Sequence, residues 1–129
     1  MNEIRDELLE KVIGGRSGAG LAEWAEKAVG QNYVFGGLGA GGFDDVGLIV
    51  SYAGGPRNAE TMLAIAPEKG NIASLPEIPG IGLYKSGHVG VYLGSGMCVN
   101  AVNENRGVVI GSIGSGGWQY WFKISGLDY

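Results

Sequence analysis

Three residues of this sequence suggest chemistry: one suited to proton transfer, one to nucleophilic attack, and one to orienting the first. His88 is the only histidine among 129 residues, Cys98 is the only cysteine, and Asn100 follows two residues later. An imidazole gains or loses its proton near neutral pH and therefore suits general acid–base chemistry. A side-chain carbonyl at Asn100 could accept a hydrogen bond from the imidazole and fix its tautomer. The alternative is structural: a lone histidine with satisfied hydrogen bonds, and a polar residue at the rim of a sheet.

A glycine-rich loop leads directly into a predicted helix start at Asp44 and Asp45. The free N–H groups and the dipole at the start of a helix stabilise a negative charge. Thiol hydrolases place a cysteine there, because the thiolate is the reactive form. Position 45 holds an aspartate instead. Alternatively, both residues are ordinary carboxylates of a helix start, with Asp44 as the N-cap.

The apolar pattern predicts helices in the first half of the chain and strands in the second. Helical spacing indicates helices over 2–13, 20–29, 45–53 and 58–66. Short apolar runs indicate strands over 81–84, 88–93, 97–102, 108–113 and 118–124. A hairpin through Gly94-Ser95-Gly96 sets Asn100 or Ala101 roughly opposite His88. This order predicts an α+β fold, with N-terminal helices packed on a central antiparallel sheet.

Length and composition indicate one main domain and argue against several classes of protein. The chain has 129 residues, of which 45% are hydrophobic, which is enough for one packed core. We expect residues 1–18 to form an N-terminal helix and linker, and residues 19–129 to form the domain. The net charge of −4 and the lack of a basic cluster argue against nucleic-acid binding. A single cysteine excludes a disulfide within the chain.

Several short motifs, taken together and in order, resemble the NlpC-type cell-wall peptidases, which have a papain-like α+β fold. The resemblance covers about residues 19–129 and rests on Tyr33-Val34-Phe35-Gly36-Gly37, Phe43-Asp44-Asp45-Val46-Gly47-Leu48-Ile49, Pro79-Gly80, Gly87-His88-Val89-Gly90-Val91-Tyr92-Leu93-Gly94-Ser95-Gly96 and Val99-Asn100-Ala101. Each motif is weak alone, but their order and spacing together make the resemblance specific. The ending, Gly117-Trp118 with Trp121, is also similar to bacterial and phage-encoded members.

The resemblance implies cleavage of peptidoglycan stem peptides, typically beside a γ-D-glutamyl–diamino-acid bond. In that scheme a cysteine at position 45 attacks the carbonyl, His88 acts as general base and then as acid, and Asn100 orients His88. Tyr33, Asp44 and Gly87 would lie on the substrate side, where Tyr33 helps to hold the scissile region and Asp44 is mainly structural. The implied partner is a stem peptide or a related peptide, and no metal or organic cofactor is implied.

Asp45 departs from the family at the residue that would perform the chemistry. A carboxylate is a poorer nucleophile than a thiolate, and the mixed anhydride that it would form reverses readily. We therefore expect an inactive pseudoenzyme that binds cell-wall peptides or a partner, with Asp45 and His88 as a carboxylate–imidazolium pair. The alternative is an active endopeptidase, of bacterial or phage origin, that an engineered substitution at position 45 has disarmed.

Two further hypotheses keep a chemical role for other residues. Cys98 could be a relocated nucleophile because it shares the strand face of Asn100, but a strand lacks the helix dipole, and packing is the simpler role. An aspartate-based hydrolase or a weak metal site could use Asp44, Asp45, His88 and Asn100. Adjacent aspartates point in different directions, however, and this ligand set is small.

The sequence also bears on where the chain acts. No apolar run reaches the roughly 18 residues that a transmembrane helix needs, and the charged N-terminus lacks the apolar core of a signal peptide. We therefore expect no membrane partner, and a protein that stays in the compartment where it is made or acts at the cell wall after release. The sequence does not predict an oligomeric state.

Overall fold

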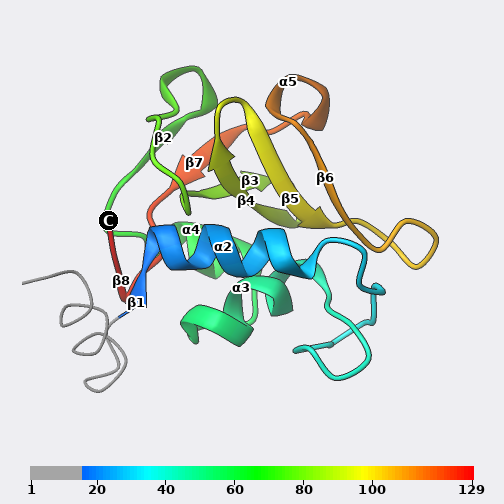
Figure 1. Ribbon diagram of the computed structural model, residues 1–129. Helices are drawn as coiled ribbons and strands as arrows, with labels where there is room; N and C mark the ends of the chain where they lie inside the picture. The colour runs from blue at the N-terminus through cyan, green and yellow to red at the C-terminus, as the bar shows by residue number, and fades with distance from the viewer. Residues whose placement is uncertain (1–15) are drawn as a thin grey trace, which may run out of the picture.

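A six-stranded antiparallel sheet forms one layer of the molecule, and the helices α2 and α3 cover one of its faces (Figure 1). The structure is a computed structural model that describes residues 16–129. The strand order is β2-β7-β3-β4-β5-β6. The strands are Lys69–Asn71 (β2), Gly82–Lys85 (β3), His88–Gly94 (β4), Met97–Ala101 (β5), Val108–Ser112 (β6) and Tyr120–Phe122 (β7). The predicted α+β class is confirmed.

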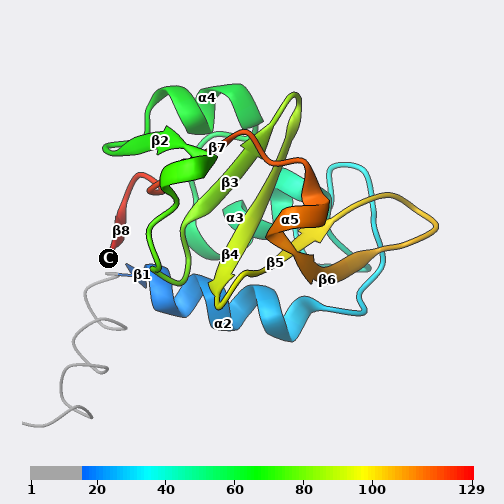
Figure 2. The same ribbon diagram turned by 90° about the horizontal axis from the view of Figure 1, so that it is seen from above.

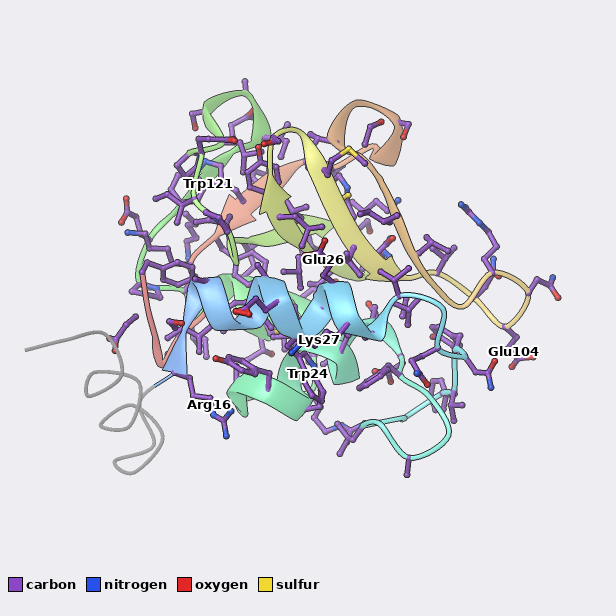
Figure 3. All side chains as sticks on the ribbon, in the orientation of Figure 1. Arg16, Trp24, Glu26, Lys27, Glu104 and Trp121 are labelled. Carbon is purple, nitrogen blue, oxygen red and sulfur yellow. The ribbon has the colours of Figure 1, made fainter. Side chains whose placement is uncertain are left out.

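The helices α2 (Gly18–Ala28) and α3 (Asp45–Ala53) are joined through one half-buried aromatic side chain. Trp24 of α2 lies over α3 (Figure 3), and its Nε1 donates to the Leu48 carbonyl and the Ser51 hydroxyl, both at 3.1 Å. Leu48 and most of the other buried apolar residues of both helices belong to the main core with the sheet. Burial of this apolar surface fixes where α3 begins relative to β4.

The two faces of the sheet contribute to different apolar clusters. Val89 and Val91 of β4 belong to the main core beneath the helices. Tyr92 of the same strand belongs to a second, smaller cluster that also contains two tryptophans. Because side chains alternate along a strand, the side chains of His88 and Asn100 belong to the same face of the sheet as Tyr92. They lie where that face meets the end of the helix layer.

Short elements close the ends of the sheet. The helix α4 (Ala59–Ala64) lies beside the turn between β3 and β4, as Figure 2 shows. A 3-10 helix (η1, Ile72–Ser74) follows β2, and a single helical turn (α5, Ile113–Gly116) follows β6. Arg16–Ser17 (β1) pairs in parallel with Leu127–Asp128 (β8). Of the helices within residues 16–129, none is both long and apolar enough to cross a membrane.

Most of the predicted elements are confirmed, and the best match is the helix over 45–53. Its limits are reproduced because Asp44 caps its start and Gly54, at a φ of 73°, follows its end. The helices predicted over 20–29 and 58–66 correspond to α2 and α4, and the hairpin between β4 and β5 is confirmed. Local capping and turn signals were therefore sufficient for these elements.

The structure differs from the predicted elements in four places. The strand predicted over 118–124 is reduced to β7, and α5 takes the end of the strand predicted over 108–113. The strand β2 was not predicted, since Lys69–Asn71 lacks an apolar alternation. Residues 16–18, predicted as the end of the linker, form β1 and the first residue of α2. The helix predicted over 2–13 lies outside the described residues, and the domain boundary after residue 18 stays a prediction.

Candidate functional site

The start of α3 is built by Asp44, which lies directly before the first helical residue. Its carboxylate accepts hydrogen bonds from the Gly47 N–H, as an N-cap does, and from the Gly36 N–H at 2.9 Å. Gly47 is required because a Cβ there would lie 1.9 Å from the Gly37 carbonyl oxygen. The loop before α3 therefore packs directly on the helix start, and the Asp44 carboxylate joins the two through backbone N–H groups.

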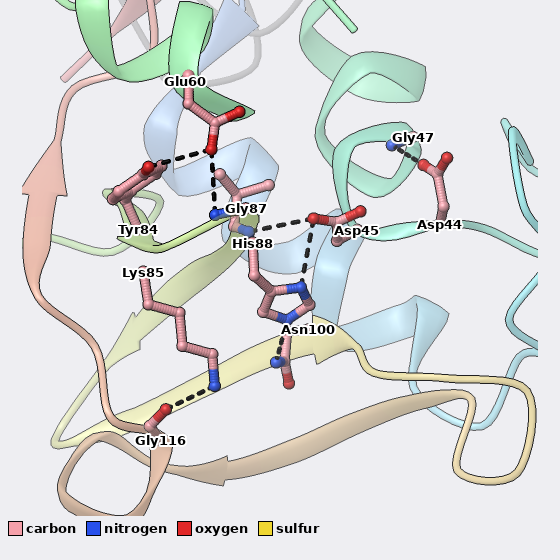
Figure 4. A network of polar contacts seen from close by, with 11 residues as sticks. Asp44, Asp45, Gly47, Glu60, Tyr84, Lys85, Gly87, His88, Asn100 and Gly116 are labelled. Atoms are coloured by element: carbon pink, nitrogen blue, oxygen red, sulfur yellow. Dashed lines mark hydrogen bonds and ion pairs between the residues drawn. The ribbon is translucent and has the colours of Figure 1, made fainter. Parts of the chain in front are cut away.

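Asp45, the first residue of α3, points to the beginning of β4 (Figure 4). Its Oδ2 lies 3.3 Å from Nδ1 of His88 and accepts from the Val89 N–H at 3.2 Å. Both side chains are largely buried, with 15% of Asp45 and 19% of His88 exposed. The structure therefore brings the helix start and the sheet rim together at the two residues singled out in the sequence.

The surroundings of Asp45 favour its charged form. Burial alone raises the pKa of this carboxyl, but the hydrogen bond and charge of His88, with the N–H groups of Val46 and Val89, outweigh that effect. The net result is a pKa below the ordinary value. Asp45 is consequently a carboxylate at neutral pH, held by directed contacts rather than by solvent.

Asn100 completes the contacts of the imidazole from the opposite side. Its Nδ2 lies 2.8 Å from Nε2 of His88. The register pairs Val91 with Val99, so Gly90 lies opposite Asn100, and His88 is a diagonal neighbour rather than the opposite residue that we expected. The contact also differs from the expected carbonyl acceptor. The amide nitrogen, rather than the carbonyl oxygen, faces Nε2, while Nδ1 faces Asp45.

Trp118 stacks on the ring of His88, a role that the sequence did not predict. The two ring centroids are 5.6 Å apart and the ring planes are inclined by 13°. Gly90 provides the space, because a Cβ there would lie 2.8 Å from the Trp118 ring. Lys85 lies over the indole ring of Trp118, with Nζ 5.0 Å from the ring centroid. Its Nζ also donates to the Gly116 carbonyl at 2.7 Å. A glycine inside a strand was the only sequence signal for this close approach.

Glu60 of α4 holds the turn that precedes His88. Its Oε2 accepts from the Gly87 N–H and from the Tyr84 hydroxyl, both at 3.0 Å (Figure 4). Gly87 has a φ of 70°, which favours glycine. The backbone N–H of Gly87, a residue expected on the substrate side, is thus already bonded within the protein. Sequence analysis missed Glu60 because its partner lies 27 residues away.

Tyr33, in the loop before α3, is half-buried. Burial and, after it, the negative charges of Asp45, Asp44 and Glu104 raise the pKa of its hydroxyl. Tyr33 is therefore within the electrostatic reach of the candidate nucleophile position and stays protonated. This placement is compatible with the expected substrate-side role, which stays a prediction.

Cys98 and the metal hypothesis find little support in the geometry. Cys98 is 3% exposed, and burial raises the pKa of its thiol, with Trp118 and Lys85 only partly offsetting the effect. A protonated, buried thiol is a weak nucleophile. Asp44 is occupied by two backbone N–H groups. Among residues 16–129, no three His, Cys, Asp or Glu side chains gather as a metal site.

Comparisons with known proteins address the fold. No protein-family model matches the sequence, and no curated protein matches it. The NlpC/p60 domain of the peptidoglycan hydrolase SagA matches with a TM-score of 0.66 and 21% identity, over 84% of this chain and 99% of that domain. NlpC2 from Trichomonas vaginalis matches with a TM-score of 0.68 and 20% identity, over 82% of this chain but 47% of that chain.

A third solved structure extends the comparison to a longer protein. The peptidoglycan hydrolase RipB from Mycobacterium tuberculosis matches with a TM-score of 0.63 and 22% identity, over 87% of this chain and 67% of that chain. The chain thus spans nearly all of the SagA domain and less than half of NlpC2. The resemblance read from the sequence motifs is matched in three dimensions, and the chain has the NlpC/p60 fold.

Proposed function

We propose that this chain is a pseudoenzyme of the NlpC type, which binds a peptidoglycan stem peptide in the cleft beside Asp45, His88 and Asn100 without cleaving it by thiol chemistry. The solved neighbours SagA and RipB are peptidoglycan hydrolases, which supports this class of ligand. The chain retains the imidazole and its amide partner in contact with each other. What it lacks is a nucleophile that can form a stable acyl intermediate.

The contact between Asp45 and His88 carries this proposal. The Asp45 carboxylate lies 3.3 Å from Nδ1 of His88, where a nucleophile would lie next to its general base. If the carboxylate attacked an amide carbonyl, the product would be a mixed anhydride. Its carboxylate leaves more readily than an amine does, so the tetrahedral species would collapse back to the starting amide. Loss of a triad nucleophile costs up to roughly 10⁶-fold in turnover in a well-studied serine hydrolase.

Restoring the thiol tests the proposal directly. We expect Asp45→Cys to cleave defined stem peptides at the γ-D-glutamyl–diamino-acid bond, while the unchanged protein stays at the background rate. The matched control is Asp45→Cys combined with His88→Ala, which keeps the thiol and removes the base. Binding of the same peptides to the unchanged protein, measured by calorimetry, tests whether the ligand is retained.

The outcomes separate the parts of the proposal. Cleavage by the unchanged protein at the rate of the Asp45→Cys variant would overturn the assignment as a pseudoenzyme. An absence of stem-peptide binding to the unchanged protein would overturn the ligand class.

The alternative, an endopeptidase disarmed by an engineered Asp45, is favoured by one observation: His88 and Asn100 keep a 2.8 Å contact although the nucleophile is gone. Under that alternative, Asp45→Cys restores the full rate of a cell-wall hydrolase in one step. A pseudoenzyme that has diverged further regains only a small part of that rate. The turnover number of Asp45→Cys on intact peptidoglycan distinguishes the two.

A further inference from the structure

We propose that the pocket on the Nε2 side of His88 binds a carboxylate of the peptide, on the residue whose nitrogen would leave if the bond were cleaved. The inference rests on the proposed function and adds to it the part of the ligand that this pocket selects. It concerns a surface on the side of the imidazole opposite Asp45.

The pocket lies between the second face of the sheet and the turn α5. Its volume is about 160 Å³, and its lining includes Lys85, His88, Asn100, Arg106 and Ser112. The candidate site and the pocket thus share His88 and Asn100. A peptide that reaches the imidazole from the α3 side can therefore continue into this pocket.

The charges in the pocket have one sign. Lys85 and Arg106 line it, and no aspartate or glutamate does, although the chain carries a net charge of −4. The other side of the imidazole has the opposite character, because Asp45 lies against Nδ1 and Asp44 and Glu104 also act on Tyr33. Asp45 and Asp44 thus lie on the α3 side of His88, and Lys85 and Arg106 lie on the pocket side.

Of the two cations that line the pocket, Arg106 is the one whose side chain the fold does not use. Within residues 16–129 its guanidinium forms no hydrogen bond or ion pair, whereas Arg57 donates to the Gly36 carbonyl and Lys123 pairs with Glu68. Lys85 is anchored on the Gly116 carbonyl, and its Nζ lies next to the indole of Trp118. A guanidinium matches a carboxylate with two parallel N–H donors.

Neutral donors add to the cations. Trp118, which is 6% exposed, lines the pocket next to the Cys98 thiol. Ser112 and Ser115 also line the pocket, and their hydroxyls bond to each other. Hydroxyl donors of this kind suit the acceptor oxygens of a ligand carboxylate.

The chemistry of cleavage indicates which residue of the peptide lies here. In a thiol mechanism the histidine gives its proton to the leaving amine, so the residue that carries this nitrogen lies beside the imidazole. A tripeptide stem ends with that residue, and its free carboxylate follows within one residue of the scissile nitrogen. The pocket beside His88 and Asn100 is therefore placed to receive this carboxylate.

A pair of probes tests the inference on the unchanged protein. The first is a tripeptide stem, L-Ala–γ-D-Glu–diamino acid, with a free terminal carboxylate, and the second is the same peptide as its terminal amide. We expect the acid to bind about tenfold more tightly, the scale of a charge-assisted hydrogen bond. The acid should also shift the NMR signals of the Trp118 indole N–H and of His88, the only histidine.

Variants locate the effect. Arg106→Gln should remove most of the preference for the acid, and Arg106→Lys should keep part of it. Lys27→Gln is the matched control, since it removes one positive charge from α2, outside the pocket. Thermal melting of each variant shows whether it is folded, and the comparison of acid with amide on the unchanged protein needs no variant.

The possible failures are distinguishable. If acid and amide bind equally and Arg106→Gln changes neither, the carboxylate pocket is overturned while the proposed ligand class stands. If neither peptide binds, the proposed function is overturned together with the inference. If the acid binds more tightly but Lys27→Gln weakens it as much as Arg106→Gln does, the preference reflects overall charge, and the pocket is again overturned.

Discussion

The strand β4 is held at each end by a glutamate from outside the sheet, and only one of these ends carries the candidate site. At the His88 end, Glu60 accepts from the Tyr84 hydroxyl and the Gly87 N–H. At the Gly94 end, Glu77 accepts from the Tyr92 hydroxyl and from the Ser95 N–H at 2.6 Å. Each exposed carboxylate joins a tyrosine hydroxyl to the N–H of a turn.

The same local arrangement has different consequences at the two ends. The Gly94 end is a two-strand hairpin whose turn is also fixed by the Gly96 N–H, which donates to the Tyr92 hydroxyl. At the His88 end, Gly87 of the turn directly precedes His88, so the turn sets the position of the imidazole relative to the Asp45 carboxylate. The contacts of Glu60 therefore bear on the geometry of the site, whereas those of Glu77 bear on the sheet alone.

The largest expected effect separates the two glutamates by activity. In the background of Asp45→Cys, we expect Glu60→Ala to lower the turnover of stem peptides by about tenfold to hundredfold, because small displacements of a catalytic group cost that much. Glu77→Ala should change turnover by less than about twofold. The measurement is the kcat of both variants on one defined stem peptide.

Thermal melting supplies the control for this comparison. Each variant removes one exposed carboxylate that accepts from a tyrosine and a turn N–H, so both should lower the melting temperature by similar amounts. If Glu60→Ala and Glu77→Ala lost the same kcat at the same melting temperature, Glu60 would act only through stability. The two ends of β4 would then not differ in their effect on the site.

The second effect concerns the stacking of Trp118 on His88, which the Gly94 end lacks. Trp118 stacks on His88 at a centroid distance of 5.6 Å. The ring current of the indole should shift the imidazole proton signals upfield, and Trp118→Leu should remove that shift while Trp118→Phe keeps part of it. In the Asp45→Cys background we expect a several-fold loss of kcat for Trp118→Leu. Imidazole signals that do not move in Trp118→Leu would contradict the stack.

The elements near the site differ in how far the sequence could predict them. Asp44, Asp45 and the hairpin after β4 were predictable, because an N-cap and a glycine turn act on neighbouring residues. Glu60 and Trp118 were not, because each reaches His88 or its turn from an element distant in sequence. The amide of Asn100 was placed on the correct strand, but the diagonal contact depends on the register of β5 and on the absence of a side chain at Gly90.

A smaller effect tests the charge at the His88 end. The pKa of Asp45 is lowered in the folded protein, since the contacts with His88 and the backbone outweigh burial. A lowered carboxyl pKa contributes stability above the unfolded value, about 3.9, and this contribution is lost as pH falls through the folded pKa. The difference in free energy of unfolding between the unchanged protein and Asp45→Asn should therefore shrink below about pH 4. A constant difference from pH 7 to pH 3 would contradict it.

The smallest effect applies the same test to the Gly94 end. The Tyr92 hydroxyl and the Ser95 N–H lower the pKa of Glu77, so the folded protein binds fewer protons there than the unfolded chain. Its contribution is present above the unfolded value, about 4.3, and is lost on acidification. Urea unfolding of Glu77→Gln against the unchanged protein should show a difference that shrinks with falling pH. Because Glu77 is exposed, this change should be smaller than that of Asp45→Asn. A larger change for Glu77→Gln than for Asp45→Asn would mean that the contact of Asp45 with His88 adds less to acid stability than an exposed turn does. The two ends of β4 would then not differ in electrostatics as we expect.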